Sequence, residues 1–163
     1  MPCEKLLEYL DLSGVDYELV HHPEAYAARD VAFKAGVSGQ EFAKTVLVKL
    51  DGLMAMAVVP AEHKINFTML RDVAGAETIA LALEDEFEAR FPDCDLGAMP
   101  PFGNLYDLAV YVSDQLTDAD SITFNAGTHT EAITMAYADF AELVAPTLGS
   151  FTFRPMMEFK GEG

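Results

Sequence analysis

Three stretches of the sequence carry residues that could act on a substrate. A lysine enters an apolar, β-branched run, FAKTVLVKL, at residues 42–50. A loop rich in proline and glycine, LGAMPPFG, covers residues 96–103, and a turn followed by a histidine, FNAGTHTEAITM, covers residues 124–135. Together they offer a cation for phosphate or an oxyanion, loop N–H groups for a carbonyl oxygen, and an imidazole that can orient water.

The lysine at the start of this run raises the question of which face of the strand it occupies. In a strand, side chains alternate between faces, so Lys44 shares a face with Val46 and Val48, whereas Lys49 points to the other face. A cation directed along an apolar face is either a ligand for an anion or a side chain whose stem packs while its ammonium reaches water. The residues alone favour the second reading.

The other two stretches are equally open when taken singly. Prolines stiffen the loop at 96–103, and its glycines let another group approach the backbone closely. A proline-glycine loop is nevertheless usually a connector, and a lone histidine after a turn is usually a surface residue. Their functional weight depends on where the fold places them.

Familiar catalytic and metal-binding signatures are missing from the sequence. GQEFAKT, at residues 39–45, approaches the end of a P-loop but lacks its glycines and leads into a strand. There is no G-x-S-x-G, no G-x-G-x-x-G after a strand and no H-E-x-x-H. Cys3 and Cys94 have no metal-like spacing, and His21 and His22 are adjacent. We therefore expect a site without metal or cofactor, and no disulfide framework.

Short helices and strands must position these residues. Apolar periodicity and end signals predict helices over residues 4–14, 27–36, 66–75, 83–91 and 137–145, and strands over 16–20, 44–50, 53–60, 108–113, 121–127 and 131–135. Asp51-Gly52 between two apolar runs predicts a tight hairpin. The mixture of adjacent strands and interspersed helices predicts an α+β fold with a curved mixed sheet.

Length and charge limit the kind of protein. A chain of 163 residues, 51% hydrophobic and 23% charged, fits one domain over 1–163. The net charge of −17, with no Lys or Arg between Arg90 and Arg154, argues against sliding on DNA. No apolar stretch approaches the roughly 18 residues of a membrane helix, and the amino terminus is acidic, so a soluble cytoplasmic protein without a membrane partner is expected.

The order of the motifs resembles one family. A strand-entry lysine followed by threonine, a central G-x-x-P-P-x-G loop and a late N-A-G turn resemble the YbaK and ProX group of aminoacyl-tRNA deacylases. That group includes the editing insertion domain of bacterial prolyl-tRNA synthetases. The resemblance covers nearly the whole chain and implies a curved, barrel-like mixed sheet flanked by helices.

The resemblance also implies an activity and a site. The reaction is trans-editing, hydrolysis of the ester that joins a wrong small amino acid (Ala, Ser or Cys) to tRNA, with tRNA-Pro as one candidate. The implied catalytic residues are Lys44, Gly97 and His129. The implied substrate-binding residues are Tyr26, Thr45, Met99, Pro100, Pro101, Phe102, Gly103, Asn125, Gly127 and Thr130. Met99, Pro101, Phe102 and Tyr26 are expected to wall the amino-acid pocket.

The strong negative charge shapes the partners that we expect. Such a protein should bind only the acceptor end of aminoacyl-tRNA, with a synthetase or an elongation factor holding the rest. Two other functions remain open: a binding or synthetase-docking module of the same fold without activity, and a hydrolase of small esters or amides. The tail at residues 151–163 is expected to be an edge strand, an interface or, preferably, a docked terminus.

Overall fold

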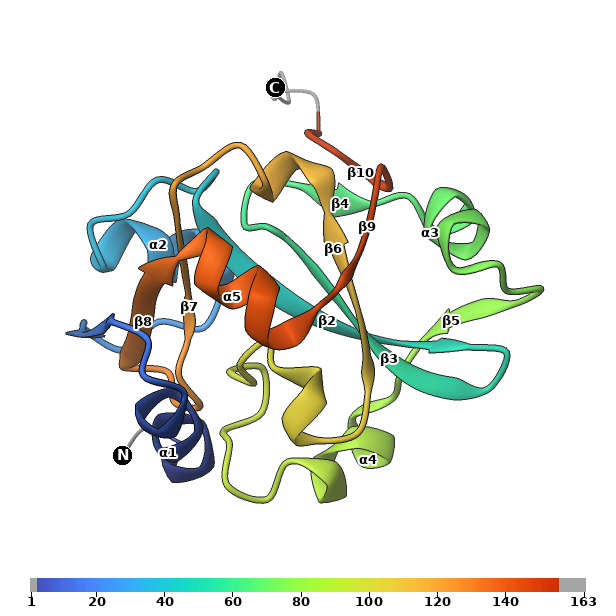
Figure 1. Ribbon diagram of the computed structural model, residues 1–163. Helices are drawn as coiled ribbons and strands as arrows, with labels where there is room; N and C mark the ends of the chain where they lie inside the picture. The colour runs from blue at the N-terminus through green and yellow to red at the C-terminus, as the bar shows by residue number, and fades with distance from the viewer. Residues whose placement is uncertain (1–2, 156–163) are drawn as a thin grey trace.

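The computed structural model describes residues 3–155, which form a mixed sheet flanked by helices (Figure 1). The strands are β1 (Tyr17–His21), β2 (Phe42–Leu50), β3 (Leu53–Pro60), β4 (Lys64–Ile65), β5 (Ile79–Leu81), β6 (Ala109–Ser113), β7 (Ser121–Asn125), β8 (Glu131–Ala136), β9 (Thr147–Gly149) and β10 (Thr152–Phe153). Eight of them form one sheet in the order β1-β8-β7-β2-β3-β6-β9, with β5 paired to β2, while β10 pairs with β4. The predicted mixed sheet is confirmed.

Five α-helices surround this sheet, as predicted. They are α1 (Glu4–Ser13), α2 (Ala28–Lys34), α3 (Phe67–Ala74), α4 (Glu84–Phe87) and α5 (Tyr137–Val144). The segment predicted as one helix over 83–91 is α4 followed by a 3₁₀ turn, Glu88–Arg90. Gly75 ends α3 with a φ of 69°, a left-handed conformation that glycine adopts without strain. None of the described helices is long and apolar enough to cross a membrane.

The hairpin of β2 and β3 is the longest ladder in the sheet. The two strands pair without interruption from Ala43 opposite Pro60 to Leu50 opposite Leu53. Asp51 and Gly52 join them with φ values of 52° and 84°, the positive pair that a twisted two-residue turn requires. The Asp51 carboxylate also accepts hydrogen bonds from the backbone N–H groups of Glu77 and Thr78, each at 2.9 Å.

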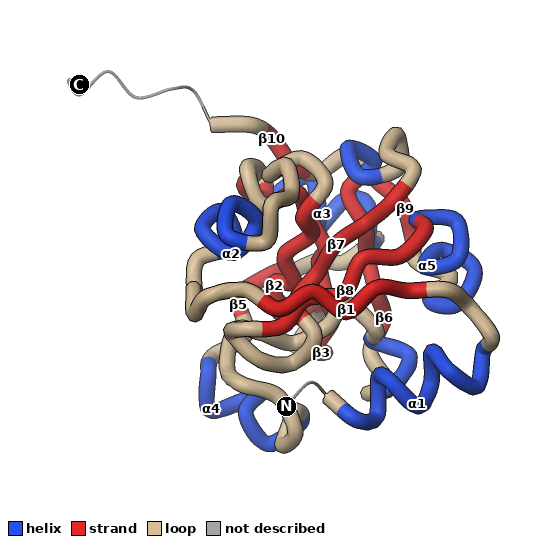
Figure 2. The backbone as a smooth tube through the Cα atoms, turned by 90° about the vertical axis from the view of Figure 1, so that its left-hand side faces the viewer, coloured by secondary structure: helices blue, strands red, loops and turns tan. Residues whose placement is uncertain are grey.

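The helices cover opposite faces of the sheet. Figure 2 shows α2 and α5 on either side of the strands. On one face, Ala43 and Leu47 of β2 pack in the cluster that contains Phe140 of α5. On the other face, Phe42 packs with Val31 of α2, and Val48 packs farther along with α3. Lys44 lies on this second face, between the α2 and α3 clusters.

The sequence did not predict the four shortest or most peripheral strands. β4, β5, β9 and β10 have two or three residues each, too few to show a period. The described part of the tail is a docked terminus, the option that the sequence favoured. Phe151 is fully buried against α3, and the next two residues form β10. Residues 156–163 of the predicted tail lie outside the described part of the chain.

Candidate functional site

A short parallel ladder brings Lys44 and Asn125 to the same face of the sheet. β2 and β7 pair in parallel over two positions only, and the second pair joins Ala43 to Phe124. Residues paired in a ladder point to the same face, and the next residue on each strand points to the opposite one. Lys44 and Asn125 follow that last pair, so both side chains lie on the face that α2 covers.

Lys44 is a half-buried cation without a partner. Among the described residues, its ammonium has no hydrogen bond or ion pair. Burial lowers the pKa of Lys44, and the positive charges of Lys64 and Arg29 lower it further. A charge that is partly removed from water and surrounded by like charges is unfavourable unless a ligand compensates it. The arrangement is therefore suited to bind an anion.

Lys49 provides the comparison within the same strand. Its Nζ lies 2.6 Å from Oε2 of Glu86. Glu86 belongs to α4, on the face of the sheet opposite Lys44. The predicted alternation of the two lysines is confirmed, but Lys49 is ion-paired and not simply solvated. Of these two lysines, only Lys44 keeps its charge available to a ligand.

A recess lies beside α2, next to Arg29. It has a volume of about 490 Å³, within the range of small-molecule pockets. The charged residues of its lining are Arg29 and Asp30 of α2 and Glu62 on the facing loop. Arg154 forms an ion pair with Glu62 at 2.9 Å and, after the larger effect of burial, lowers the pKa of the neighbouring His63. The recess therefore has mixed charge, and the cations whose charges act on Lys44 are Lys64 and Arg29.

His129 presents one ring nitrogen that has no partner. Its Nε2 lies 2.9 Å from the carbonyl oxygen of Leu96, and because a carbonyl can only accept, Nε2 must donate its hydrogen. Nδ1 of the neutral ring is then an acceptor, and it is buried without a hydrogen-bond partner among the described residues. The ring of Tyr26 lies over the imidazole, with the centroids 4.4 Å apart. The imidazole is fixed in orientation and has one acceptor left.

Gly97 lies directly beside that imidazole. Its φ is 86°, and a Cβ at this position would stand 3.7 Å from Cε1 of His129. Gly97 is exposed, and its N–H has no acceptor within residues 3–155. The structure therefore brings together three of the predicted residues, Gly97, His129 and Tyr26, with a backbone donor facing outward.

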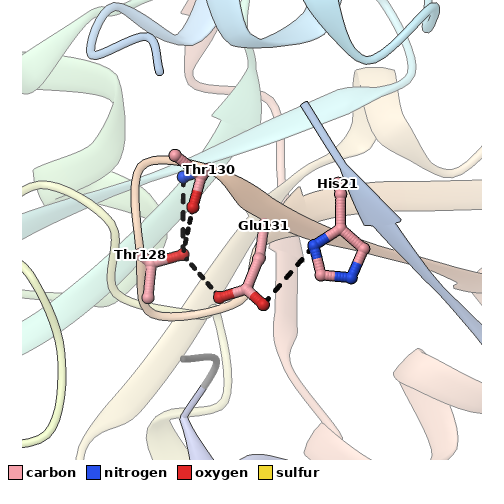
Figure 3. A network of polar contacts seen from close by, with 4 residues as sticks. All are labelled: His21, Thr128, Thr130 and Glu131. Carbon is pink, nitrogen blue, oxygen red and sulfur yellow. Dashed lines mark hydrogen bonds and ion pairs between the residues drawn. The ribbon is translucent and has the colours of Figure 1, made fainter. Parts of the chain in front are cut away.

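Polar contacts shape the turn that carries His129 (Figure 3). Thr128 donates a hydrogen bond to Oε1 of Glu131 at 3.0 Å, and Nδ1 of His21 lies 3.6 Å from Oε2 of the same carboxylate. The N–H of Thr130 donates to Oγ1 of Thr128 at 3.4 Å. These contacts tie the 128–131 segment to β1 and hold His129 from both sides. Thr130, a predicted binding residue, is exposed on this turn.

Of the predicted pocket wall, Tyr26 lies beside His129, whereas the loop residues are buried. Five predicted residues of the loop are buried: Met99, Pro100, Pro101, Phe102 and Gly103. The ring of Phe102 packs against Phe124 and Phe140, with centroids 5.5 Å and 5.4 Å away, on the face opposite Lys44. Thr45 is half-buried and points to that same opposite face. The structure thus gives Phe102 a place in the core, not beside Lys44.

The remaining predicted residues support the turn after β7. Asn125 is buried, and its Oδ1 has no partner among the described residues. Gly127 has a φ of 102°, and a Cβ there would lie 2.9 Å from Cβ of Cys3, so only glycine fits. No pattern in the sequence indicates that Arg29 and Lys64 approach Lys44, because their proximity is set by tertiary packing.

Comparisons with known proteins agree with this geometry. The family model of the aminoacyl-tRNA editing domain matches residues 22–143, most of the chain. The multifunctional Ser/Thr-tRNA deacylase ProXp-y of Escherichia coli (strain K12) is 25% identical over 153 residues, which cover 91% of each chain. The proline–tRNA ligase of Bacillus mycoides (strain KBAB4) is 24% identical over 93 residues, 57% of this chain and 16% of the ligase.

Two solved structures share the fold. One is a candidate trans-editing enzyme for prolyl-tRNA synthetase, with a TM-score of 0.81 and 14% identity over 93% of this chain and 96% of that chain. The other is a hypothetical protein, with a TM-score of 0.81 and 18% identity over 91% of this chain and 99% of that chain. The resemblance to the YbaK and ProX group is confirmed, and the chain belongs to the aminoacyl-tRNA editing domain family.

Proposed function

We propose that this protein is a trans-acting deacylase that hydrolyses the ester between a tRNA and a mischarged small amino acid, Ala, Ser or Cys. Misacylated tRNA-Pro is the first candidate carrier. One observation carries the proposal: within residues 3–155 the half-buried ammonium of Lys44 has no hydrogen-bond or ion-pair partner, and the charges of Lys64 and Arg29 act on it. In a chain with a net charge of −17, such a group of cations is suited to the phosphates or ribose oxygens of a terminal adenosine.

Hydrolysis needs few catalytic groups because an aminoacyl ester is already activated. Water adds to the ester carbonyl, the bond between that carbon and the ribose oxygen breaks, and the ribose oxygen regains a proton. In this proposal the N–H of Gly97, which has no acceptor among the described residues, stabilises the oxyanion, and the imidazole of His129 orients the attacking water. Lys44 holds the substrate in position for this attack.

The choice of amino acid follows from the limits of synthetases. A synthetase pocket distinguishes ligands that differ by one methylene by only about 1–3 kcal/mol, so small wrong amino acids are loaded and must be removed at a second site. The relative named as a Ser/Thr-tRNA deacylase supports serine among the three candidates. The unpartnered Oδ1 of Asn125 is an acceptor that a serine or ribose hydroxyl would satisfy.

The acidic surface supports a division of labour. Binding to the phosphate backbone of nucleic acid depends on Lys and Arg, and only 10 of the 163 residues are of these types, against 27 acidic ones. The protein therefore engages the acceptor end, while a synthetase or an elongation factor holds the body of the tRNA. Strong, salt-sensitive binding to bare tRNA would contradict this division.

The test is single-turnover deacylation of tRNAs charged with Ala, Ser, Cys, Thr and Pro, including misacylated tRNA-Pro. We expect rapid release of one or two small amino acids by the wild type. Removal of the Lys44 charge in Lys44→Met should slow the release by about 100-fold or more, because misplacement of the substrate by about 1 Å can cost that much. Lys49→Met, on the same strand, is the matched control and should remain active.

Other outcomes would select the other functions. Binding of an acceptor-stem mimic with no release from any tRNA would favour the inactive binding module. Equal hydrolysis of free aminoacyl esters and of aminoacyl-tRNA would favour a hydrolase of small molecules. Full activity of Lys44→Met would remove the central role that we assign to Lys44.

A further inference from the structure

Two cysteines far apart in the sequence meet behind the candidate site. Cys3 caps the amino end of α1, and Cys94 precedes the loop that carries Gly97. Sγ of Cys3 lies 3.1 Å from Oδ2 of Asp93, and Sγ of Cys94 lies 4.0 Å from Oδ1 of the same side chain. The ligand atoms of Cys3, Asp93 and Cys94 all lie within 4.8 Å of one another. Both cysteines are free thiols.

A fourth polar group, the hydroxyl of Tyr106, completes the cluster. The hydroxyl of Tyr106 lies 3.5 Å from Sγ of Cys3 and 3.6 Å from Sγ of Cys94. Cys3 is 1% exposed, so this end of the cluster is closed to solvent, while Cys94 is half-buried and Asp93 is exposed. The cluster is thus closed on the core side and reachable from the surface.

These spacings fit a tetrahedral metal ion. Zn–S bonds of about 2.3 Å and Zn–O bonds of about 2.1 Å, at tetrahedral angles, place neighbouring donor atoms about 3.6–3.8 Å apart. The four sulfur–oxygen distances in the cluster run from 3.1 Å to 4.0 Å. We infer that Cys3, Cys94 and Asp93 bind a thiophilic divalent cation of the Zn²⁺ class, with the Tyr106 hydroxyl or a water at the fourth position.

The two thiols of the cluster shift each other's pKa in opposite directions. Hydrogen bonding from Cys94 lowers the pKa of Cys3 to about 7. The pKa of Cys94 is raised, first because of its contact with Cys3 and then because of burial. Cysteine binds metal as a thiolate, so binding of the cation would release the thiol protons, and the proposal rests on the distances above.

The cation would hold together the segments that form the candidate site. The N–H of Cys3 donates to the carbonyl of Ala126 at 2.8 Å, and the N–H of Asp95 donates to the carbonyl of Gly127 at 2.7 Å. The ligands therefore flank the turn that leads to His129 and the loop that holds Gly97. A metal ion here has a structural role: it joins the start of α1 to both loops and touches no reacting atom.

Binding is tested with untagged, reduced protein that has been freed of metal by chelation. We expect Co²⁺ to bind one-to-one, with a thiolate-to-cobalt charge-transfer band and the visible bands of a tetrahedral centre, and Zn²⁺ to displace it. Zn²⁺ should also raise the melting temperature, because it binds the folded state. Failure of folded wild-type protein to give these bands would overturn the inference.

Variants distinguish this site from adventitious binding. Cys94→Ser should abolish the charge-transfer band or reduce it by about half, and Asp93→Asn should weaken Co²⁺ binding at least 10-fold. Cys94 and Asp93 are at least partly accessible, so we expect both variants to fold, which circular dichroism can verify. They test the site even if Cys3→Ser fails to fold. Asp95→Asn, an adjacent acid outside the ligand set, is the matched control. Unchanged binding in Cys94→Ser would contradict the proposal, as would a Cys3–Cys94 disulfide that forms in place of metal binding.

Discussion

Cε1 of His129 lies 3.7 Å from the point where a Cβ on Gly97 would stand. The imidazole and the loop therefore lie close together, and the N–H of the exposed Gly97 has no acceptor among the described residues. Since Gly97 also has a φ of 86°, both the space and the conformation favour glycine. The contact joins two sequence motifs that are more than 30 positions apart.

Replacement of this glycine should affect activity more than stability. In Gly97→Ala, the left-handed conformation costs about 1–2 kcal/mol. The added methyl also covers the N–H and the face of His129, so we expect deacylation to fall at least 10-fold. Gly75→Ala is the control, because Gly75 has a φ of 69° with no atom within 4 Å of an added Cβ. Equal loss of activity in both variants would show that the effect is only backbone strain.

Lys44→Met should make the protein more stable while it removes activity. The pKa of Lys44 is lowered in the folded state below its ordinary value of 10.5, so the charged form is disfavoured by folding. Between the two pKa values the unfolded chain binds more protons, and wild-type stability should rise with pH in that window. At pH 7 we expect Lys44→Met to gain about 0.5–1 kcal/mol, with the gain shrinking as pH approaches 10.5.

Urea unfolding of both proteins between pH 7 and pH 10 measures this difference. Lys49→Met provides the opposite control, since it removes the ion pair with Glu86 and should be neutral or slightly destabilising. A Lys44→Met protein that is less stable than the wild type at pH 7 would show that the ammonium is adequately solvated in the fold.

Phe102→Ala should act mainly on stability. The ring is fully buried among Phe124 and Phe140, and its loss leaves a cavity that typically costs about 3–5 kcal/mol. For a chain of this size that corresponds to a fall in melting temperature of roughly 6–20 °C. Leu12→Ala, at a position that is 89% exposed, should change little. A stable Phe102→Ala protein with altered amino-acid preference would restore Phe102 to the pocket wall.

Asp51→Ala should destabilise the hairpin in a pH-dependent way. The backbone N–H groups of Thr78 and Glu77 lower the pKa of the Asp51 carboxyl below its ordinary value of 3.8. A depressed carboxyl contributes stability above its unfolded-state pKa, and that contribution is lost as pH falls through the folded-state value. Thermal melts should therefore show a lower melting temperature for Asp51→Ala at pH 7, and convergence with the wild type near pH 2–3. A difference that persists at low pH would indicate a conformational effect of the substitution.

The sequence predicted the elements well where local chemistry decides them. Asp51 and Gly52 specified the hairpin turn, and the alternation around Lys44 and Lys49 specified the two faces of β2. The family resemblance then singled out Lys44 as the lysine expected in the site. These features depend on residues that are neighbours along the chain.

Relationships across the sheet could not be predicted in the same way. The burial of Phe102 depends on α5, which lies almost 40 positions later, and the meeting of Cys3 with Cys94 depends on the packing of α1 against a distant loop. The cations near Lys44 come from α2 and β4, and no local pattern reports their distance. These contacts form only when the chain folds, so a single sequence does not show them as a local pattern.

The short ladder between β2 and β7 explains why the site lies where it does. Eight residue pairs hold β2 to β3, but only two hold β2 to β7. Just past the last pair β7 ends at Asn125, whereas β2 continues to Leu50 and pairs with β5 instead. Lys44 and Asn125 stand at this fork. We therefore expect the path of the backbone to set the location of the candidate site, and the side chains at the fork to select its ligand.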